Sequence, residues 1–490
     1  MSELSRSNSL CRFRRFITGA ALFTGLCMGA EGMGAEAQAN GRFPASTNAQ
    51  FQPASSDVIL LPTTFGLLVS SDDGAQFHWV CEEAIGYGGT YDPDYAINGD
   101  GTIYATTFNG VQVSRDGACT FSDTEFYGDL SGGNTPVLLA PGYFVSEIEV
   151  GSDGRIWAAT STGADSNNIY ISTDGNAFRS TNAFQEVAWW KSLRVSTSNP
   201  DLAYAAGYQI PGSDPVTPAR ALLYKTTDGG TNWTDLGTTS FAFGSQPNLV
   251  VMGISPTNSD IVYAKVLAAR TPEGDDMYRS SDGGLSFTKV LEMNAVISAF
   301  VVRSDDSVVV GQATPCADDF STQPDAALPT KGCVRVSPDG TENSWTTPVE
   351  EPKMGCINER GSDNKLFACG HNWEPDNFAL GYSEDNAQSW TKIVRLGDVT
   401  GPLSCPVGTI QNECELTSWP AVCTMLGICV GGDPDAGIGP GEQDGGLTVI
   451  PPEDDSCLGC QSGNSGGLPF AGFVLAMYFL AFRRRTRSQE

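Results

Sequence analysis

The chain has 490 residues, of which 40% are apolar, so it can bury a large core. Its 57 acidic and 28 basic residues give a formal net charge of −29. This balance argues against nucleic acid as a partner, because phosphates require clustered Lys and Arg, and it disfavours peripheral binding to anionic membranes. Charge of this size keeps an exported protein soluble, and a dedicated cation-binding role is the alternative.

Residues 1–39 have the pattern of a secretory signal peptide. Three arginines precede an apolar stretch over residues 16–30, and the small-x-small sequence AQA (37–39) follows, as signal peptidase requires. We therefore expect the chain to be exported, with the mature protein beginning at Asn40.

One short signature recurs seven times between residues 70 and 390. Ser or Thr is followed two residues later by Asp, and each copy ends in Phe or Trp, as in SSDDGAQF (70–77) and TTDGGTNW (226–233). We call these segments the Ser/Thr-x-Asp turns. Their aspartates are Asp72, Asp116, Asp174, Asp228, Asp282, Asp339 and Asp385.

The residue types of this signature indicate a structural role. The Asp carboxylate can accept hydrogen bonds from backbone N–H groups of its own turn, and Ser or Thr adds to them. Gly supplies a left-handed backbone position, and the closing aromatic ring enters the hydrophobic layer. We therefore expect each copy to stabilise a turn between two strands and to take no part in catalysis.

A second phrase, a polar turn followed by an apolar strand, precedes the copies, as in GDGTIYATTF (99–108) and GSDGRIWAAT (151–160). Each unit then consists of four short strands, A to D, which is what a propeller blade requires. The sequence predicts an all-β fold, a single β-propeller of about seven four-stranded blades over residues 40–400. Complete units begin near residues 42, 88, 144, 190, 248, 296 and 353, and an eighth blade would need a unit without the signature.

Turns of this kind in this position resemble the Asp boxes (BNR repeats) of the propellers in the sialidase, sortilin and photosystem II assembly factor group. The resemblance covers roughly residues 42–400. It implies that the turn joins strands C and D, that the A–B turns lie on the same face, and that ligands bind on the opposite face. That opposite face is made by the B–C and D–A connections.

The B–C connections are predicted to be long and irregular in five units, at 161–168, 207–220, 268–277, 312–332 and 370–378. Elaborated loops on one face of a rigid scaffold are a usual place for function. The candidate contact residues there are Trp189, Trp190, Tyr208, Arg220, Arg270 and Trp373. The carboxylates of these loops are Asp214, Asp275, Asp276, Asp318 and Asp319.

Each of these sets has two interpretations. Exposed tryptophans can stack on sugar rings, or they cover the interior of a blade. The loop carboxylates are either solvated or ligands of calcium, which prefers several oxygen atoms. The sequence gives no other metal site and no cofactor motif.

Ten cysteines fall in the exported region, and such an even set predicts disulfides. They are Cys81, Cys119, Cys316, Cys333, Cys356, Cys369, Cys405, Cys414, Cys423 and Cys429. We expect Cys316 and Cys333 to bracket the longest B–C loop, Cys356 and Cys369 to lie on neighbouring strands, and Cys81 and Cys119 to link the first two blades. The last four predict a small disulfide-stapled module over residues 401–430, because so short a segment cannot hold a core alone.

The C-terminal part is predicted to be an acidic Gly/Pro linker (431–456) followed by a sorting tag (457–490). The tag contains Cys457 and Cys460, an apolar run over 468–482 and a cluster of arginines. It resembles the MYXO-CTERM sorting tag of myxobacteria and their relatives, which implies anchoring at the surface of a Gram-negative cell, associated with the outer membrane. A plain C-terminal transmembrane helix is the alternative, although fifteen helical residues span only about 22 Å.

Two functions follow from this organisation. The first is a binding or scaffold protein at the cell surface, with an extracellular glycan or protein as ligand. The alternative is a secreted glycoside hydrolase, either sialidase-like or active on β-glucans. A sialidase-like site would require three converging arginines, whose first member normally stands in an Arg-Ile-Pro phrase that this sequence lacks, and β-glucan-active relatives usually use two propellers where this chain has material for one.

Overall fold

Short strands follow one another along the chain and group into seven sheets, each built around a run of consecutive antiparallel strands. The computed structural model describes residues 43–53, 55–89, 91–128, 144–161, 167–184, 187–209, 219–244, 247–270, 274–293, 295–312, 334–347, 352–373 and 376–429. The predicted signal peptide, the linker, the sorting tag with Cys457 and Cys460, and the pair Cys316 and Cys333 lie outside these ranges. Among the residues that are described, no helix is both long enough and apolar enough to cross a membrane.

Blades 1 and 3 each carry one extra strand on the outer edge of the sheet, and blade 2 has four strands. The strands of blade 1 are β1 (Gln50–Phe51), β2 (Ile59–Thr63), β3 (Gly66–Ser70), β4 (His78–Val80) and β29 (Gly401–Pro402). Those of blade 2 are β5 (Tyr95–Ile97), β6 (Ile103–Thr107), β7 (Gly110–Ser114) and β8 (Ser122–Asp123). Those of blade 3 are β10 (Val145–Val150), β11 (Ile156–Thr160), β12 (Ile169–Ser172), β13 (Ala177–Ser180) and, parallel to β13, β9 (Glu125–Tyr127).

The remaining four sheets repeat the plain pattern. Blade 4 has β14 (Ala188–Val195), β15 (Ala203–Gln209), β16 (Arg220–Thr226) and β17 (Thr234–Asp235). Blade 5 has β18 (Leu249–Ile254), β19 (Val262–Arg270), β20 (Gly274–Ser280) and β21 (Thr288–Glu292). Blade 6 has β22 (Ala299–Val302), β23 (Val308–Gly311) and β24 (Val334–Ser337), with an isolated bridge from Val336 to Thr346 where a fourth strand would pair. Blade 7 has β25 (Cys356–Glu359), β26 (Leu366–Cys369), β27 (Leu380–Ser383) and β28 (Thr391–Val394).

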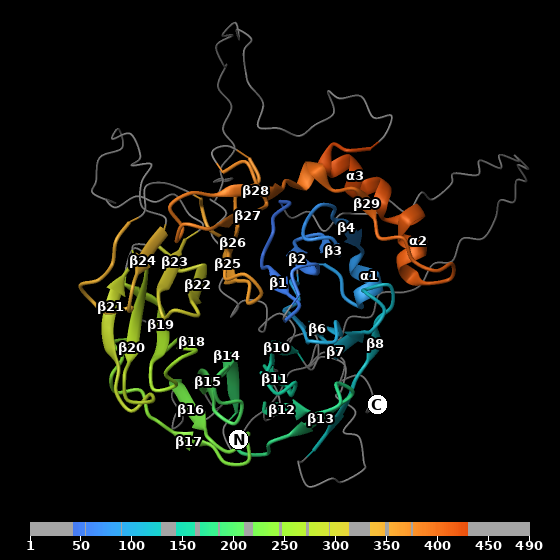
Figure 1. Cartoon of the computed structure of the whole chain (residues 1–490). Helices are drawn as coiled ribbons and strands as arrows, with labels where there is room; N and C mark the ends of the chain where they lie inside the picture. Colours follow the sequence, from blue (N-terminus) through green and yellow to red (C-terminus); the bar gives the residue numbers. More distant parts are fainter. Residues whose placement is uncertain are drawn as a thin grey trace, which may run out of the picture. The chain divides into compact units, whose positions relative to one another are not determined.

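The first strand of each blade lies innermost, and these inner strands contact one another in sequence from blade to blade, as Figure 1 shows. The fold is therefore an all-β, seven-bladed propeller of four-stranded sheets, and the prediction is confirmed. The strands run antiparallel, so the A–B and C–D turns share one face, the C–D/A–B face. The B–C and D–A connections share the other, the B–C/D–A face.

The seven Ser/Thr-x-Asp turns all lie between the third and fourth strands, on the C–D/A–B face. In blade 1, Asp72 accepts hydrogen bonds from the Ser70 hydroxyl (2.8 Å) and from the backbone N–H of Gln76 (2.9 Å). The matching Ser/Thr-to-Asp bond recurs in all seven turns at 2.8–3.4 Å. In blade 5, the hydroxyl and N–H of Ser286 lower the pKa of Asp282 to about 2. Each carboxylate is thus engaged in its own turn.

An aromatic residue on the second strand of a blade packs against the turn of the next blade. The hydroxyl of Tyr263 in blade 5 donates to the backbone oxygen of Asp339 in blade 6 (3.2 Å). A Cβ added to Gly340, whose φ is +67°, would lie 2.2 Å from that hydroxyl. Tyr104 makes the same approach to Gly175. The aromatic residue in the second repeated phrase therefore sets the spacing between blades.

We predict that Gly340→Ala destabilises the propeller by about 2 kcal/mol or more, because the new methyl group meets the Tyr263 hydroxyl at a left-handed backbone position. Gly117→Ala is the matched control, since Gly117 also lies in a Ser/Thr-x-Asp turn at positive φ but has open space where the Cβ would stand. Its cost should be about 1 kcal/mol. Denaturant unfolding measures both, and equal losses would contradict the packing role of the glycine.

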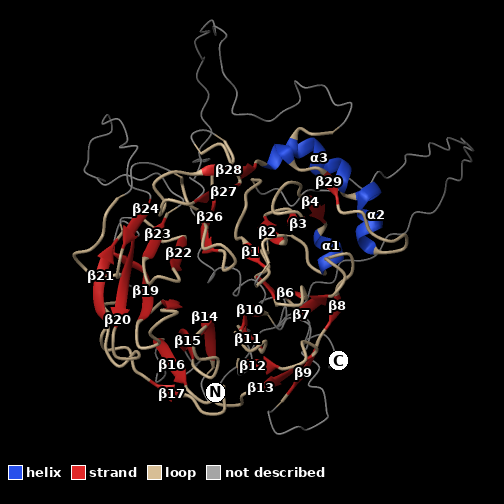
Figure 2. Cartoon of the chain, viewed as in Figure 1, coloured by secondary structure: helices blue, strands red, loops and turns tan. Residues whose placement is uncertain are grey.

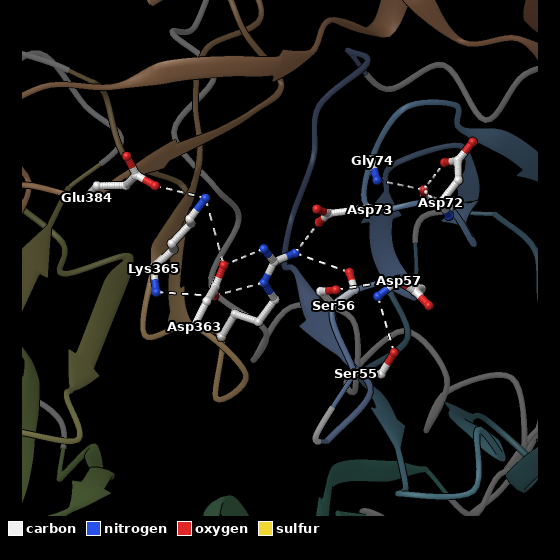
Figure 3. Close-up of polar contacts among 11 residues, drawn as sticks. Ser55, Ser56, Asp57, Asp72, Asp73, Gly74, Asp363, Lys365 and Glu384 are labelled. Atoms are coloured by element: carbon white, nitrogen blue, oxygen red, sulfur yellow. Dashed lines mark hydrogen bonds and ion pairs between the residues drawn. The ribbon is translucent and has the colours of Figure 1, made fainter.

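The seam between blades 7 and 1 closes the ring. Arg360, which is 3% exposed, donates to Asp363 of its own blade (2.6 and 3.0 Å) and to Asp73 and the backbone oxygen of Ser56 (3.2 Å) in blade 1. Figure 3 shows Asp363 on one side of this seam and Asp73 and Ser56 on the other. The hydroxyl of Ser46 also donates to the backbone oxygen of Ala379 (2.7 Å) in the buried part of the seam.

Residues 395–429, which we call the strap, continue from blade 7 across the outer edges of blades 1 and 2. The strap contains the 3-10 helix η1 (Leu396–Asp398), β29 and the helices α2 (Ile410–Thr417) and α3 (Trp419–Leu426). β29 pairs in parallel with β4, and Figure 2 shows α2 and α3 beside these strands, near α1 (Glu82–Ile85). Buried strap residues belong to the same hydrophobic cluster as blades 7, 1 and 2.

The disulfides correct part of the sequence prediction. Cys81 pairs with Cys414, and Cys119 pairs with Cys405, so these cysteines attach the strap to blades 1 and 2 and do not link the two blades directly. Within the strap, only Cys423 and Cys429 pair with each other. The segment therefore holds its position by docking on the propeller, and it is not a self-contained module. Cys356 pairs with Cys369 across strands β25 and β26, as the sequence predicted.

Replacing the four strap-to-blade cysteines by Ser should lower the free energy of unfolding by roughly 5 kcal/mol, because these bonds close loops of 333 and 286 residues in the unfolded chain. The control pair, Cys423→Ser with Cys429→Ser, opens a loop of 6 residues and should cost about 2 kcal/mol. Thermal and denaturant unfolding of both variants test this. Similar losses in the two variants would contradict the dependence on loop length.

Candidate functional site

Exposed apolar side chains collect on the B–C/D–A face. Of the eight exposed large hydrophobic residues in the described part of the chain, four lie there: Phe43 (66% exposed), Phe108 (45%), Val187 (41%) and Val296 (47%). Three others lie on the strap, and only Leu285 lies on the C–D/A–B face. The face predicted to bind ligands is thus the more apolar of the two.

An aromatic group that we call the blade 2 platform lies on this face and consists of Tyr91, Phe108 and Phe144. The ring centroids are 4.6 Å apart for Tyr91 and Phe108, and 5.4 Å apart for Tyr91 and Phe144. Phe108 and Phe144 are 5.6 Å apart. Phe108 stands in the two-residue B–C turn between β6 and β7, and its neighbours come from the D–A connections that enter blades 2 and 3. The three rings form one compact cluster with Phe108 outermost.

A second aromatic pair lies at the seam of blades 7 and 1. The predicted contact residue Trp373 is half-buried in the B–C loop of blade 7, and its ring centroid is 4.6 Å from that of Phe43. The backbone oxygen of Phe43 accepts a hydrogen bond from Thr64 in the B–C turn of blade 1 (2.9 Å). Trp373 therefore lies on the predicted face and is part of its aromatic surface.

The two tryptophans of blade 4 differ in position. Trp190 is fully buried, with its ring 4.5 Å from that of Phe184, so it belongs to the blade interior and is removed from the candidate contact residues. Trp189 is 7% exposed and lies beside the half-buried Tyr208, with ring centroids 5.7 Å apart. The ammonium of Lys191 lies 5.9 and 5.8 Å from these two rings. Burial lowers the pKa of Lys191 and raises that of Tyr208 to about 12.

The other predicted contact residues are less accessible or already engaged. Arg220 is exposed, and its Nε donates to Gln209 (2.9 Å) on the neighbouring strand. Arg270 ends β19, and its side chain lies outside the described part. Asp275 and Asp276 are not in an open loop: both lie in β20 and are 0% and 5% exposed.

Asp275 has structural partners in place of a calcium ion. It accepts hydrogen bonds from the backbone N–H of Ala268 (3.1 Å) and Ile297 (2.9 Å), and Lys265 lies 3.6 Å away. These bonds tie the B–C end of blade 5 to the connection entering blade 6. Asp214, Asp318 and Asp319 lie outside the described residues.

Among the described residues, the cluster with metal-ligand spacing is Cys81, Glu83 and Cys414. Cys81 and Cys414 are joined in a disulfide, and their sulfurs are therefore not thiolates that could bind a metal ion. The acidic turns of the C–D/A–B face bind their own backbone.

An inner-strand ion cluster, which the sequence analysis did not identify, crosses blades 2, 3 and 4. It consists of Asp94, Glu147, Glu149 and Arg194. Nη1 of Arg194 lies 2.8 Å from Glu147 and 2.9 Å from Glu149, both on β10. Asp94 accepts a hydrogen bond from the backbone N–H of Ile148 (3.1 Å), across the seam of blades 2 and 3. The signal in the sequence was the pair of glutamates at alternate positions of a predicted inner strand.

Three carboxylates share one arginine in this cluster, and the pKa values of two of them, Glu149 and Asp94, are raised. Burial raises the pKa of Glu149 to about 7, with Arg194 opposing the shift and Glu147 adding to it. Burial also raises the pKa of Asp94 strongly, and the nearby charge of Glu147 adds to the shift. Carboxyl groups with raised pKa values of this kind are found at functional sites and at structural ion networks alike.

We predict that the protein loses thermal stability as the pH rises from about 5 to about 8. A carboxyl group with a raised pKa binds its proton more tightly in the folded than in the unfolded chain, so its contribution is complete below the ordinary value of 4.5 and is lost as the pH passes through about 7 for Glu149. Each 1 kcal/mol lost corresponds to about 2–4 °C in Tm for a large domain. Glu149→Gln should flatten the profile, whereas Glu415→Gln, on the exposed side of α2, should leave its slope unchanged.

Comparison with known proteins identifies no family for the chain, and it finds only distant similarity to solved structures. No family model matches it, and no curated protein matches it. Similar solved structures include the GH74 xyloglucanase from Xanthomonas campestris, at 15% identity, TM-score 0.37, and coverage of 70% of this chain and 57% of that chain. YCF48 from Cyanidioschyzon merolae is similar at 12% identity, TM-score 0.41, and coverage of 67% and 92%. YCF48 bound to D1 peptide is similar at 11% identity, TM-score 0.33, and coverage of 51% and 67%.

These comparisons concern the propeller fold. The chain spans a little over half of the xyloglucanase, 57% of its length. The chemistry of the site is therefore argued below from the residues of this chain.

Proposed function

We propose that the protein is an exported propeller, anchored at the cell surface, that binds an extracellular glycan or protein ligand through its B–C/D–A face. The observation that carries this proposal is the unequal use of the two faces. Four of the exposed apolar residues and two aromatic groups lie on the B–C/D–A face. Exposed apolar and aromatic residues that gather on one face favour that face as the binding surface.

The opposite face supports the same assignment by its chemistry. Its Ser, Thr and Asp side chains bind their own turns, and its cations bridge neighbouring blades, as Arg155 does with Asp201 (2.6 Å). We assign these turns to the Asp-box type on the recurrence of one bonding pattern in all seven blades. Their role is to build the ring, which leaves ligand contact to the other face.

Export and anchoring rest on the two ends of the sequence. The signal peptide over residues 1–39 directs export, and the tag over residues 457–490 attaches the chain to the surface of a Gram-negative cell. The acidic linker between the strap and the tag then acts as a spacer that holds the propeller away from the membrane.

A glycoside hydrolase is the second candidate, and one observation favours it. Glu149 and Asp94 have raised pKa values and lie near a third carboxylate, Glu147, and glycosidases need a protonated and an ionised carboxyl group on either side of the scissile bond. Against this role, Arg194 binds both glutamates, so neither is positioned free of an ion pair. Binding without hydrolysis therefore has the better support.

The test is a binding experiment that also detects products. The full-length protein is applied to a glycan array and to intact bacterial cells, and released sugars are analysed in parallel. We expect binding without sugar release. The double variant Val187→Glu, Val296→Glu should weaken binding about tenfold or more by placing charge on the binding face, while Leu285→Glu on the other face should not.

Two outcomes would overturn the proposal. Sugar release that Glu149→Gln abolishes would establish the hydrolase. Equal weakening of binding by the Leu285 variant and by the double variant would show that the B–C/D–A face is not the binding surface.

A further inference from the structure

The blade 2 platform combines an exposed ring with a rigid support. Phe108 is 45% exposed, while Tyr91 behind it is fixed by its hydroxyl, which lies 2.7 Å from the Thr106 hydroxyl and donates to the backbone oxygen of Val145 (3.3 Å). Phe144 supports both rings from the next blade. An aromatic surface that is already ordered loses little conformational entropy when a ligand stacks on it.

A polar side chain accompanies the exposed ring of this platform. Asn109 follows Phe108 directly in the two-residue B–C turn and is itself exposed, so a carboxamide and the Phe108 ring stand on the same short turn.

The charge around the platform is negative. Asp92 and Glu147 lie close enough to Tyr91 to act electrostatically on its hydroxyl, and the whole chain carries −29. An anionic ligand would be repelled both at long range and at the site. Carboxylate and carboxamide oxygens accept hydrogen bonds from hydroxyl groups instead. A ligand that carries many hydroxyl groups can donate these bonds.

The platform also stands on turns, and it offers no free strand edge. A peptide that binds by strand addition needs such an edge for its backbone hydrogen bonds. A pyranose ring needs only a flat aromatic surface for its C–H face and acceptors around it for its hydroxyl groups. The chemistry of the platform matches this second kind of ligand.

We infer that Tyr91, Phe108 and Phe144 form a stacking site for an uncharged polysaccharide. This inference rests on the proposed binding function and names the ligand class of the same face. The sugar ring lies on Phe108, and its hydroxyl groups donate to the carboxamide oxygen of Asn109. Tyr91 and Phe144 are positioning residues that hold the Phe108 ring in place.

The experiment is affinity electrophoresis of the full-length protein in native gels that contain one polysaccharide each. The neutral probes are a β-1,4-glucan, a β-1,3-glucan, a xylan and a galactomannan. Alginate serves as the anionic probe and chitosan as the cationic probe. We expect retardation by at least one neutral probe, and this retardation should persist between low salt and about 0.5 M NaCl, because stacking on an uncharged sugar is not screened.

Three variants locate the site. Phe108→Ala should weaken binding to the retarding polysaccharide by roughly three- to tenfold, and Phe108→Trp should retain it, because only the first removes the stacking surface. Leu285→Ala is the matched control, an exposed apolar residue of the other face that should not change binding. Unchanged thermal unfolding of all three variants shows that the effect is local.

The outcomes separate this inference from the proposed function. Undiminished binding of Phe108→Ala to the same polysaccharide, retardation by alginate or chitosan alone, or loss of retardation in salt would overturn the inference. If the protein still binds cells or array glycans through the B–C/D–A face in any of these cases, the proposed function stands. Absence of binding to every probe and to cells would overturn both.

Discussion

Closure of the ring between blade 7 and blade 1 is the constraint on which the rest of the structure depends. The four antiparallel strands of blade 1 are consecutive in the chain, and the C-terminal strand β29 joins this blade only as a short parallel strand on its outer edge. The seam depends on Arg360 and on the strap, which runs on from blade 7 and is bonded through Cys414 and Cys405 to Cys81 and Cys119. The last described segment of the chain thus holds the first two blades in place.

The division of labour between the two faces follows from the same geometry. Antiparallel four-stranded blades place every A–B and C–D turn on one side, and the repeated bonding pattern uses the polar groups there to order turns and join blades. The described B–C and D–A connections do not share a repeated hydrogen-bonding pattern of this kind. They differ in length from two residues in blade 2 to long segments in blades 4 and 6, and they present aromatic surface. The bonds that order turns and join blades therefore lie at one end of the strands, and the exposed aromatic surface lies at the other.

The inner-strand ion cluster determines the electrostatic environment next to the blade 2 platform. Arg194 neutralises part of a group of three carboxylates that belong to different blades, and the remaining negative charge lies beneath the blade 2 platform, next to Tyr91. Because these carboxyl groups are partly buried, protonation of Glu149 and Asp94 is favoured at neutral pH. The negative charge that remains disfavours anions near the centre of the ring.

The sequence by itself determined the features that depend on neighbours a few residues apart. The seven turns are stabilised by bonds within five residues, so their recurrence predicted the number of blades and the position of each turn, and the pairing of Cys356 with Cys369 followed from adjacent strands. Only the tertiary structure decided the partners of Cys81 and Cys119, the burial of Trp190 and Asp275, and the meeting of Asp94, Glu147 and Arg194. These depend on contacts between different blades or between the strap and the ring, up to 333 residues apart in the chain, and no local pattern encodes which blade faces which.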